Sequence, residues 1–221
     1  MVPVCLVLVR FPAASAATPG VTPESAEDSA RDRNPRFRLV FGVAALFFLY
    51  VGIEVAVVGW IAAYAQRTGE PGSNFWIMMP SFFWAPFLAG RALAPAVLRR
   101  LSESNVIRSG LLLGLAGITL LLVAPTVPGI ATGIAAAGLG FAAIFPLLVA
   151  LLPQHFGTGT RLAGPMFAAG GIGGATLPWM VGLISARFGT LQAGLLVPLL
   201  AGLALFGLHS VIVTRRRASF D

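Results

Sequence analysis

Glu54 is the residue whose type and position most directly suggest chemistry. It is the only charged residue between positions 39 and 66, and it lies near the middle of that apolar segment. Tyr50 and Tyr64 fall on the same face of a helix through this segment, at helical steps of three and four residues. An ionisable group at such depth is costly unless it faces a cavity or a partner, and a low dielectric constant favours the protonated carboxyl group. We predict a site for a proton or a hydroxyl-rich ligand; the alternative is a structural carboxyl group hydrogen-bonded between helices.

Aromatic side chains gather in the next apolar segment. Phe83, Trp84 and Phe87 lie deep within it. Rings at this depth can stack against a sugar-like ligand, but aromatic residues also fill the interior of any helical bundle. We expect packing to be the more common role, and we retain Phe83 and Trp84 as candidate ligand contacts.

Arginines follow the aromatic cluster. Arg91 comes directly after Gly90, about two turns before the apolar segment ends, and Arg99 and Arg100 follow in the next loop. A long arginine side chain can extend along the helix to reach the aqueous interface, which is the simpler interpretation of Arg91. The functional interpretation is that Gly90, Arg91, Arg99 and Arg100 form an inner gate, where arginine binds helix ends or a carboxylate.

Glycine and proline suggest bending in the later segments. Gly173 and Gly174 precede Pro178, and Pro146 lies inside another apolar run. Proline removes a helical hydrogen bond, so Pro146, Gly173, Gly174 and Pro178 are predicted sites of helix bending. The same residues also occur in static membrane helices.

The composition shows which elements must position these residues. The chain has 221 residues, of which 57% are hydrophobic and only 10% are charged. A water-soluble domain carries about a quarter of its residues as charged side chains, so a soluble enzyme is excluded. All fifteen basic residues are arginine, which excludes a P-loop and Schiff-base chemistry, and a single cysteine excludes an internal disulfide. We expect no enzyme activity, no metal site and no cofactor.

Long runs without charge predict membrane-spanning helices, because a helix satisfies its own backbone hydrogen bonds where no water can reach. The predicted spans are 39–65, 74–98, 107–124, 129–152, 162–186 and 190–213. The third and sixth spans are rich in leucine and poor in polar side chains, which is typical of lipid-facing helices. This recurrence predicts an all-α membrane protein with six transmembrane helices in a 3+3 repeat.

The arginines predict the orientation, since cytoplasmic loops of membrane proteins carry an excess of basic residues. If the segment before the first span is cytoplasmic, two arginines, Arg67 and Arg187, fall outside. Those inside are Arg10, Arg31, Arg33, Arg36, Arg38, Arg99, Arg100, Arg108, Arg161, Arg215, Arg216 and Arg217. Both ends of the six-span block are therefore predicted to face the cytoplasm. The net charge of +7 reflects this placement, so we expect no nucleic-acid partner.

The N-terminal segment differs from the rest of the chain. Residues 1–12 begin with an apolar run that is too short to cross a bilayer. A signal peptide would place the arginine-rich segment outside, against the predicted orientation, so we interpret 1–12 as the remnant of a preceding transmembrane helix. Residues 13–37 have the composition of a disordered cytoplasmic linker, 38–214 form the six-helix block, and 215–221 form a cytoplasmic tail.

Several short motifs resemble the C-terminal six-helix half of a major facilitator superfamily transporter, nearest to its fucose permease-like sugar:proton symporter branch. They are Phe48-Leu49-Tyr50-Val51-Gly52-Ile53-Glu54 with Trp60 and Tyr64, Phe83-Trp84 before Gly90-Arg91, Gly138-Leu139-Gly140 with Ile144-Phe145-Pro146, and Gly173-Gly174 with Pro178 and Gly182. Trp60 joins the candidate site residues on this basis.

The resemblance implies alternating access, with a small solute held between two six-helix halves. Spans one and four would line the cavity, two and five would face the other half, and three and six would face lipid. The expected function is proton-coupled transport of a small, sugar-like solute in the inner cell membrane. Because only one half is present, a half without autonomous activity and a homodimer of two halves remain alternatives. The expected partners are the bilayer, the solute, and an N-terminal half or a second copy.

Overall fold

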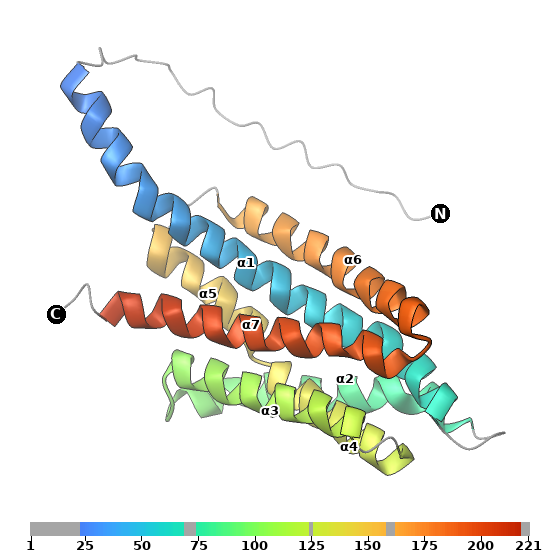
Figure 1. Ribbon diagram of the computed structural model, residues 1–221. Coiled ribbons are helices and arrows are strands. Elements are labelled where there is room, and N and C mark those ends of the chain that lie inside the picture. Colours follow the sequence, from blue (N-terminus) through green and yellow to red (C-terminus); the bar gives the residue numbers. More distant parts are fainter. Residues whose placement is uncertain (1–22, 69–73, 124–125, 158–161, 218–221) are drawn as a thin grey trace, which may run out of the picture. The chain divides into compact units, whose positions relative to one another are not determined.

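The computed structural model describes residues 23–68, 74–123, 126–157 and 162–217, and these residues are helical apart from short turns. No strand occurs in these ranges. In chain order the elements are α1 (Pro23–Thr68), a short 3-10 helix η1 (Phe75–Met78), α2 (Met79–Leu98), α3 (Glu103–Val123), α4 (Val127–Phe141), α5 (Ile144–Phe156), α6 (Ala163–Phe188) and α7 (Leu191–Arg217), as labelled in Figure 1.

Six stretches within the described residues are long and apolar enough to cross a membrane. They are Phe37–Thr68, Phe75–Leu98, Glu103–Val123, Val127–Gln154, Ala163–Phe188 and Leu191–Ile212. Each overlaps one predicted span and differs from it by a few residues at the ends. The prediction of an all-α membrane protein with six spanning helices is therefore confirmed.

The chain divides into two units, one ending at Phe37 and the other beginning at Arg38. Residues 23–37, which belong to the linker predicted over 13–37, are the first part of α1; the assignment of 13–37 as a cytoplasmic linker stays a prediction. Alanine, glutamate and arginine between positions 24 and 33 are good helix formers, which an argument from polarity alone does not weigh. Residues 1–22 and 218–221, which include the predicted helix remnant and most of the predicted tail, lie outside the described residues.

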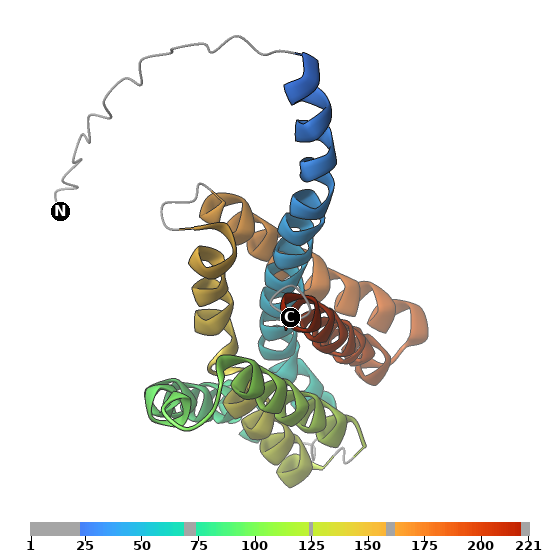
Figure 2. The same ribbon diagram turned by 90° about the vertical axis from the view of Figure 1, so that its left-hand side faces the viewer.

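The part of α1 within the second unit forms the centre of the bundle. Val43, Phe47, Tyr50, Val57 and Ile61 are all at most 1% exposed and recur at steps of three, four and seven residues. They mark a helical face turned to the core. Side chains of this face and its flanks contact α3, α4, α5 and α6. Figure 2 shows α5 and α7 on opposite sides of α1, with α6 crossing behind it.

Small residues let the remaining helices approach one another closely. α3 packs along α4, α2 packs against α4, and α6 packs along α7. A Cβ on Gly117 would overlap the carbonyl oxygen of Gly133, and the converse clash would occur at Gly133. Backbone therefore meets backbone in the α3–α4 pair, as is typical of membrane helices with small residues at their interface.

The fourth span is divided into α4 and α5 by a turn at Ala142 and Ala143. Pro146 accounts for this break, because proline has no N–H to donate to the carbonyl group four residues earlier, which is that of Ala142. The sequence predicts bending at Pro146, and the structure places the break in the turn just before it. Tyr50 and Arg91 both bind at this break, as described below.

The spans differ in how much of their surface is covered. Only 11% of the most apolar window of the second span and 22% of that of the fifth are buried, against 56% for the fourth. Large apolar side chains are correspondingly exposed on α2 and α6, among them Leu88, Ile172 and Trp179. α2 and α6 thus present the most open apolar surfaces of the bundle.

Candidate functional site

A cavity of about 350 Å³ lies between α1, α2, α5 and α6. Its lining combines one acid, one base, three phenylalanines and two glycines. The lining residues are Phe47, Val51, Glu54, Arg91, Phe145, Phe167, Gly170 and Gly171. Glu54 and Arg91, the arginine about two turns before the end of the second predicted span, thus line the same cavity.

Three polar side chains form a cluster at this cavity. The carboxyl group of Glu54 and the guanidinium group of Arg91 interact electrostatically, and the Tyr50 hydroxyl group lies close to both. Tyr50 itself is 1% exposed. Glu54 is half-buried and Arg91 is exposed on α2. A carboxylate and a guanidinium that share a site inside membrane spans stabilise each other's charge.

Arg91 is held in place by two contacts beside the cavity. Its Nε donates a hydrogen bond to the carbonyl oxygen of Ala142, at 3.2 Å. Its Cζ lies 4.4 Å from the ring centroid of Phe87, a cation–π contact. Phe87 is in turn stacked on Phe83 at 5.4 Å, and both rings are buried. The position of the guanidinium group is therefore fixed by α2 itself and by the turn between α4 and α5.

The break before Pro146 explains why Tyr50 and Arg91 bind where they do. The Ala142 carbonyl, which Pro146 cannot satisfy, accepts the hydrogen bond from Arg91. The neighbouring Phe141 carbonyl accepts a hydrogen bond from the Tyr50 hydroxyl group at 3.0 Å. A buried carbonyl without a partner is costly in a membrane, so these two side chains replace the hydrogen bonds that the break removes.

Replacing Tyr50 with Phe should lower the free energy of unfolding by about 1.5 kcal/mol, because it leaves the Phe141 carbonyl buried without its donor. The measurement is unfolding of the purified chain by sodium dodecyl sulfate in mild detergent, followed by circular dichroism. Phe41→Tyr is the matched control, since Phe41 is 69% exposed and a hydroxyl group there meets no core. Equal stability of Tyr50→Phe and wild type would show that the bond contributes nothing.

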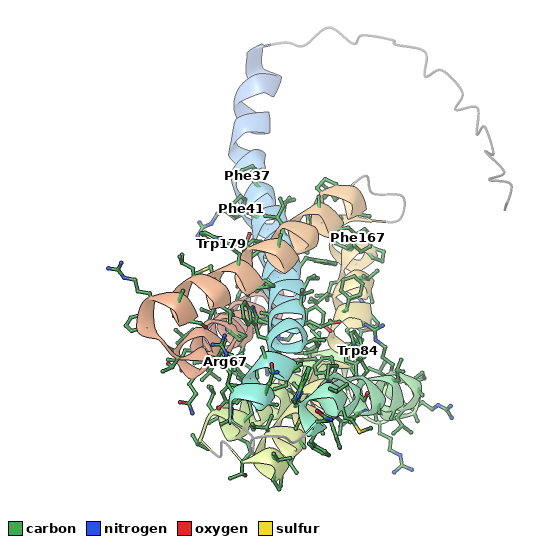
Figure 3. The ribbon with its side chains drawn as sticks, turned by 90° about the vertical axis from the view of Figure 1, so that its right-hand side faces the viewer. Phe37, Phe41, Arg67, Trp84, Phe167 and Trp179 are labelled. Carbon is green, nitrogen blue, oxygen red and sulfur yellow. The ribbon has the colours of Figure 1, made fainter. Side chains whose placement is uncertain are left out.

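Phenylalanine rings form the apolar walls of the cavity. Phe47 makes edge-to-face contacts with Phe145 at 5.8 Å and with Phe167 at 5.9 Å. On α6, one turn after Phe167, a Cβ at Gly171 would meet nothing within 4 Å, so this glycine leaves space open. Figure 3 shows Phe167 and Trp84 on the side of α1 where α5 lies, and Trp179 on the other side.

Two predicted site residues serve contacts between helices and do not line the cavity. The Tyr64 hydroxyl group donates to the Leu121 carbonyl at 3.1 Å and accepts from Gln192 at 3.3 Å. Trp60 donates through Nε1 to the Pro178 carbonyl at 3.0 Å. Tyr64 shares a helical face with Glu54, but ten residues of helix separate them by about 15 Å along the axis. The expectation of one site with two phenol hydroxyl groups thus holds for Tyr50 alone.

The other predicted site and gate residues lie on α2 and in the turn after it. Phe83 is fully buried and packs against Phe87, whereas Trp84 is 40% exposed. Gly90 brings α2 close to the break, since a Cβ there would lie 2.6 Å from the Ala142 Cβ. Arg99 and Arg100 are exposed in the turn between α2 and α3.

The predicted bending residues of α6 have a different setting from Pro146. α6 continues as one helix through Gly173, Gly174 and Pro178. Gly173 packs directly against the backbone of Phe48 on α1, where a Cβ would overlap the Phe48 carbonyl oxygen. The absent side chain of Gly173 therefore permits the close contact between α1 and α6.

Sequence reasoning did not single out the apolar lining of the cavity. Phe47, Phe145, Phe167, Gly170 and Gly171 come from three helices. Phe145 adjoins Pro146, so its place beside a predicted bend was a usable signal. For Phe47 and Phe167 no local signal exists, because phenylalanine is common on every face of these helices. Among the described residues, no group of three His, Cys, Asp or Glu side chains could hold a metal ion.

Comparison by sequence finds no matching protein family and no matching curated protein. Solved structures do match. A variant of the E. coli fucose:proton symporter FucP is similar with a TM-score of 0.71 and 21% identity, over 92% of this chain and 50% of that one. A structure described as a major facilitator superfamily transporter, FucP, in the outward conformation is similar with a TM-score of 0.66 and 20% identity, over 92% and 49%. The chain thus spans about half the length of the structures it matches, and it has the fold of one half of a major facilitator superfamily transporter.

Proposed function

We propose that this chain is one half of a secondary transporter that moves a small solute across the cell membrane by alternating access, coupled to protons. The observation that carries the proposal is the cavity that Glu54 and Arg91 both line, inside membrane spans. Ionisable residues at that depth mark substrate and proton pathways in membrane proteins. The matched structures are of a fucose:proton symporter, which supports proton coupling and a small polar solute.

The partner in this proposal is a second six-helix half. The open apolar surfaces of α2 and α6 would pack against it, since these spans are the least covered in the bundle. The solute would then lie between the halves, against Glu54 and Arg91 and close to the buried Tyr50. Trp84, which is partly exposed, would add an aromatic contact from α2.

Arginine placement supports an orientation for the proposal. The turn with Arg99 and Arg100 would be cytoplasmic, as would both ends of the six-helix block. Gly90, Arg91, Arg99 and Arg100 would then lie toward the cytoplasmic side of α2, where closure of an inner gate takes place in alternating access.

Reconstitution tests the proposal and its alternatives together. The chain is placed in liposomes alone and with a co-expressed N-terminal six-helix half, and uptake of a panel of labelled small solutes is measured under an inward proton gradient. Uptake only with the second half would identify a half-transporter, and uptake by the chain alone, with dimers captured by cross-linking, would identify a homodimer. No uptake of any solute in either preparation would leave a bundle without transport activity and contradict the proposal.

A further inference from the structure

The charges at the cavity restrict which solute can travel with a proton. Among the described residues, the ionisable groups at the cavity are Glu54 and Tyr50 on α1 and Arg91 on α2. The linings from α5 and α6 are phenylalanine and glycine only. Arginine keeps its charge in proteins, and a phenol is neutral near pH 7. Glu54 is therefore the group at this cavity that can exchange a proton.

Counting charge in each state separates the classes of solute. With Glu54 ionised and Arg91 cationic, the empty cavity is neutral. Protonation of Glu54 leaves one positive charge on Arg91, which is exposed on the open face of α2. Inside a membrane span, a charge without a partner of opposite sign is unfavourable. A neutral solute leaves that charge in place. A solute with one negative charge removes it, so the loaded, protonated cavity is neutral again.

We propose that this cavity binds a monocarboxylate, whose carboxylate group pairs with Arg91 while Glu54 takes up a proton. The inference rests on the proposed function and names the solute class of the same site. The proton comes from the aqueous phase and binds a Glu54 carboxylate oxygen, and the solute carboxylate takes over the electrostatic partner that Glu54 gives up. One proton and one anion cross together, so the complete step moves no net charge.

The setting of Arg91 suits such an exchange. Its Nε is used by the Ala142 carbonyl and its plane is held over Phe87, so the guanidinium group stays in place when Glu54 is neutralised. A guanidinium group matches a carboxylate in geometry as well as charge, and a fixed one loses little freedom on binding. When Glu54 takes up a proton, Arg91 therefore exchanges the Glu54 carboxylate for the solute carboxylate, while its guanidinium group stays in place.

The walls of the cavity favour a compact apolar body behind the carboxylate. Phe47, Phe145 and Phe167 present ring edges and faces, which pack well against another aromatic ring. A volume of about 350 Å³ is at the lower end for small-molecule sites and suits a single ring with its carboxylate. Benzoate is thus a suitable probe, and benzamide, which has the same shape without the charge, is its neutral counterpart.

The test measures binding and proton uptake with the purified full chain in detergent. Labelled benzoate and benzamide are compared by equilibrium dialysis against protein-free micelles, and proton uptake is followed with an indicator dye in weak buffer. We expect benzoate to bind at least about tenfold more tightly than benzamide, which is the ratio that one charge-assisted hydrogen bond provides. Binding of benzoate should be accompanied by uptake of protons.

Variants assign the two roles. Arg91→Gln should weaken benzoate binding at least about tenfold and remove the preference over benzamide, and Arg91→Lys should restore part of it, because a point charge lacks the guanidinium geometry. Glu54→Gln should keep benzoate binding and lose the proton uptake. Glu103→Gln and Arg187→Gln are matched controls outside the cavity and should behave as wild type.

Three results would overturn the inference: equal affinity for benzoate and benzamide, proton uptake that persists in Glu54→Gln, or no benzoate binding by folded wild-type chain. These outcomes are separable from failure of the proposed function. If the reconstituted system takes up a neutral solute such as L-fucose and the chain does not bind benzoate, the transport proposal stands and the monocarboxylate proposal is wrong. If benzoate binds with uptake of protons but no solute is transported, the monocarboxylate proposal stands and the transport proposal is wrong.

Discussion

Proton-driven solute uptake should fall to the rate of protein-free liposomes when Glu54 is replaced with Gln. Gln keeps the shape and hydrogen-bonding capacity of the side chain but cannot bind and release a proton. Because Glu54 lines the cavity with Arg91, the variant also leaves the positive charge of Arg91 without a partner when no solute is bound. The chain and its second half are reconstituted in liposomes that enclose a pH-sensitive dye. Solute uptake and acidification of the interior are measured with the solute that gives the largest wild-type signal.

The control for this experiment is Glu103→Gln. Glu103 begins α3, and its carboxylate accepts a hydrogen bond from Gln154 at 3.0 Å on the exposed surface. The Glu103→Gln substitution removes one negative charge from the chain, as Glu54→Gln does, but lies outside the cavity. Solute uptake and acidification of the liposomes should therefore be unchanged. If Glu54→Gln also leaves proton coupling intact, Glu54 is a structural carboxyl group between helices and the proton pathway lies elsewhere.

Replacing Gly173 with Ala should lower the free energy of unfolding by about 3 kcal/mol, the upper end of what one inserted methyl group costs in a packed interior. The added Cβ would overlap the backbone carbonyl of Phe48, which cannot change rotamer to avoid it. α1 and α6 must therefore move apart at this contact. Since α1 and α6 both line the cavity, the variant should also weaken solute binding.

Gly164→Ala provides the comparison on the same helix. A Cβ at Gly164 would meet nothing within 4 Å, so alanine gains helix propensity there and adds no contact. Unfolding by sodium dodecyl sulfate in mild detergent should give this variant wild-type stability or slightly more. A Gly173→Ala protein as stable as Gly164→Ala would mean that α1 and α6 do not pack backbone to backbone at this position.

Much of the fold is predictable from where charge is absent. Runs such as 109–160 and 162–186 contain no charged side chain, and the described helices fill these runs almost completely. The reason is physical: in lipid a backbone must satisfy its own hydrogen bonds, so a long apolar run has few alternatives to a helix. Over residues 23–37 charge is frequent, and polarity alone does not tell a disordered segment from a helix such as the first part of α1.

The candidate site is less predictable because its residues meet across helices. Helical periodicity predicts Tyr50 beside Glu54, and the two side chains interact in the structure. The same periodicity added Tyr64, which lies on the right face but three turns away. Arg91 was visible as an unusual residue, yet nothing in its own segment showed that it faces Glu54, 37 positions earlier. Such a relation depends on the rotation and tilt of two helices, which packing decides.

The break between α4 and α5 also bears on how the protein is assembled in the membrane. A fourth span inserted alone would expose the Ala142 carbonyl to lipid, since Pro146 cannot donate to it, and an unsatisfied carbonyl there costs several kcal/mol. Arg91 donates to the Ala142 carbonyl, and Tyr50 donates to the neighbouring Phe141 carbonyl. Both donors belong to spans that are synthesised before the fourth. Biosynthetic order therefore supplies both donors before the carbonyls that need them, and the fourth span becomes a stable membrane helix only as a late addition to a bundle that already contains α1 and α2.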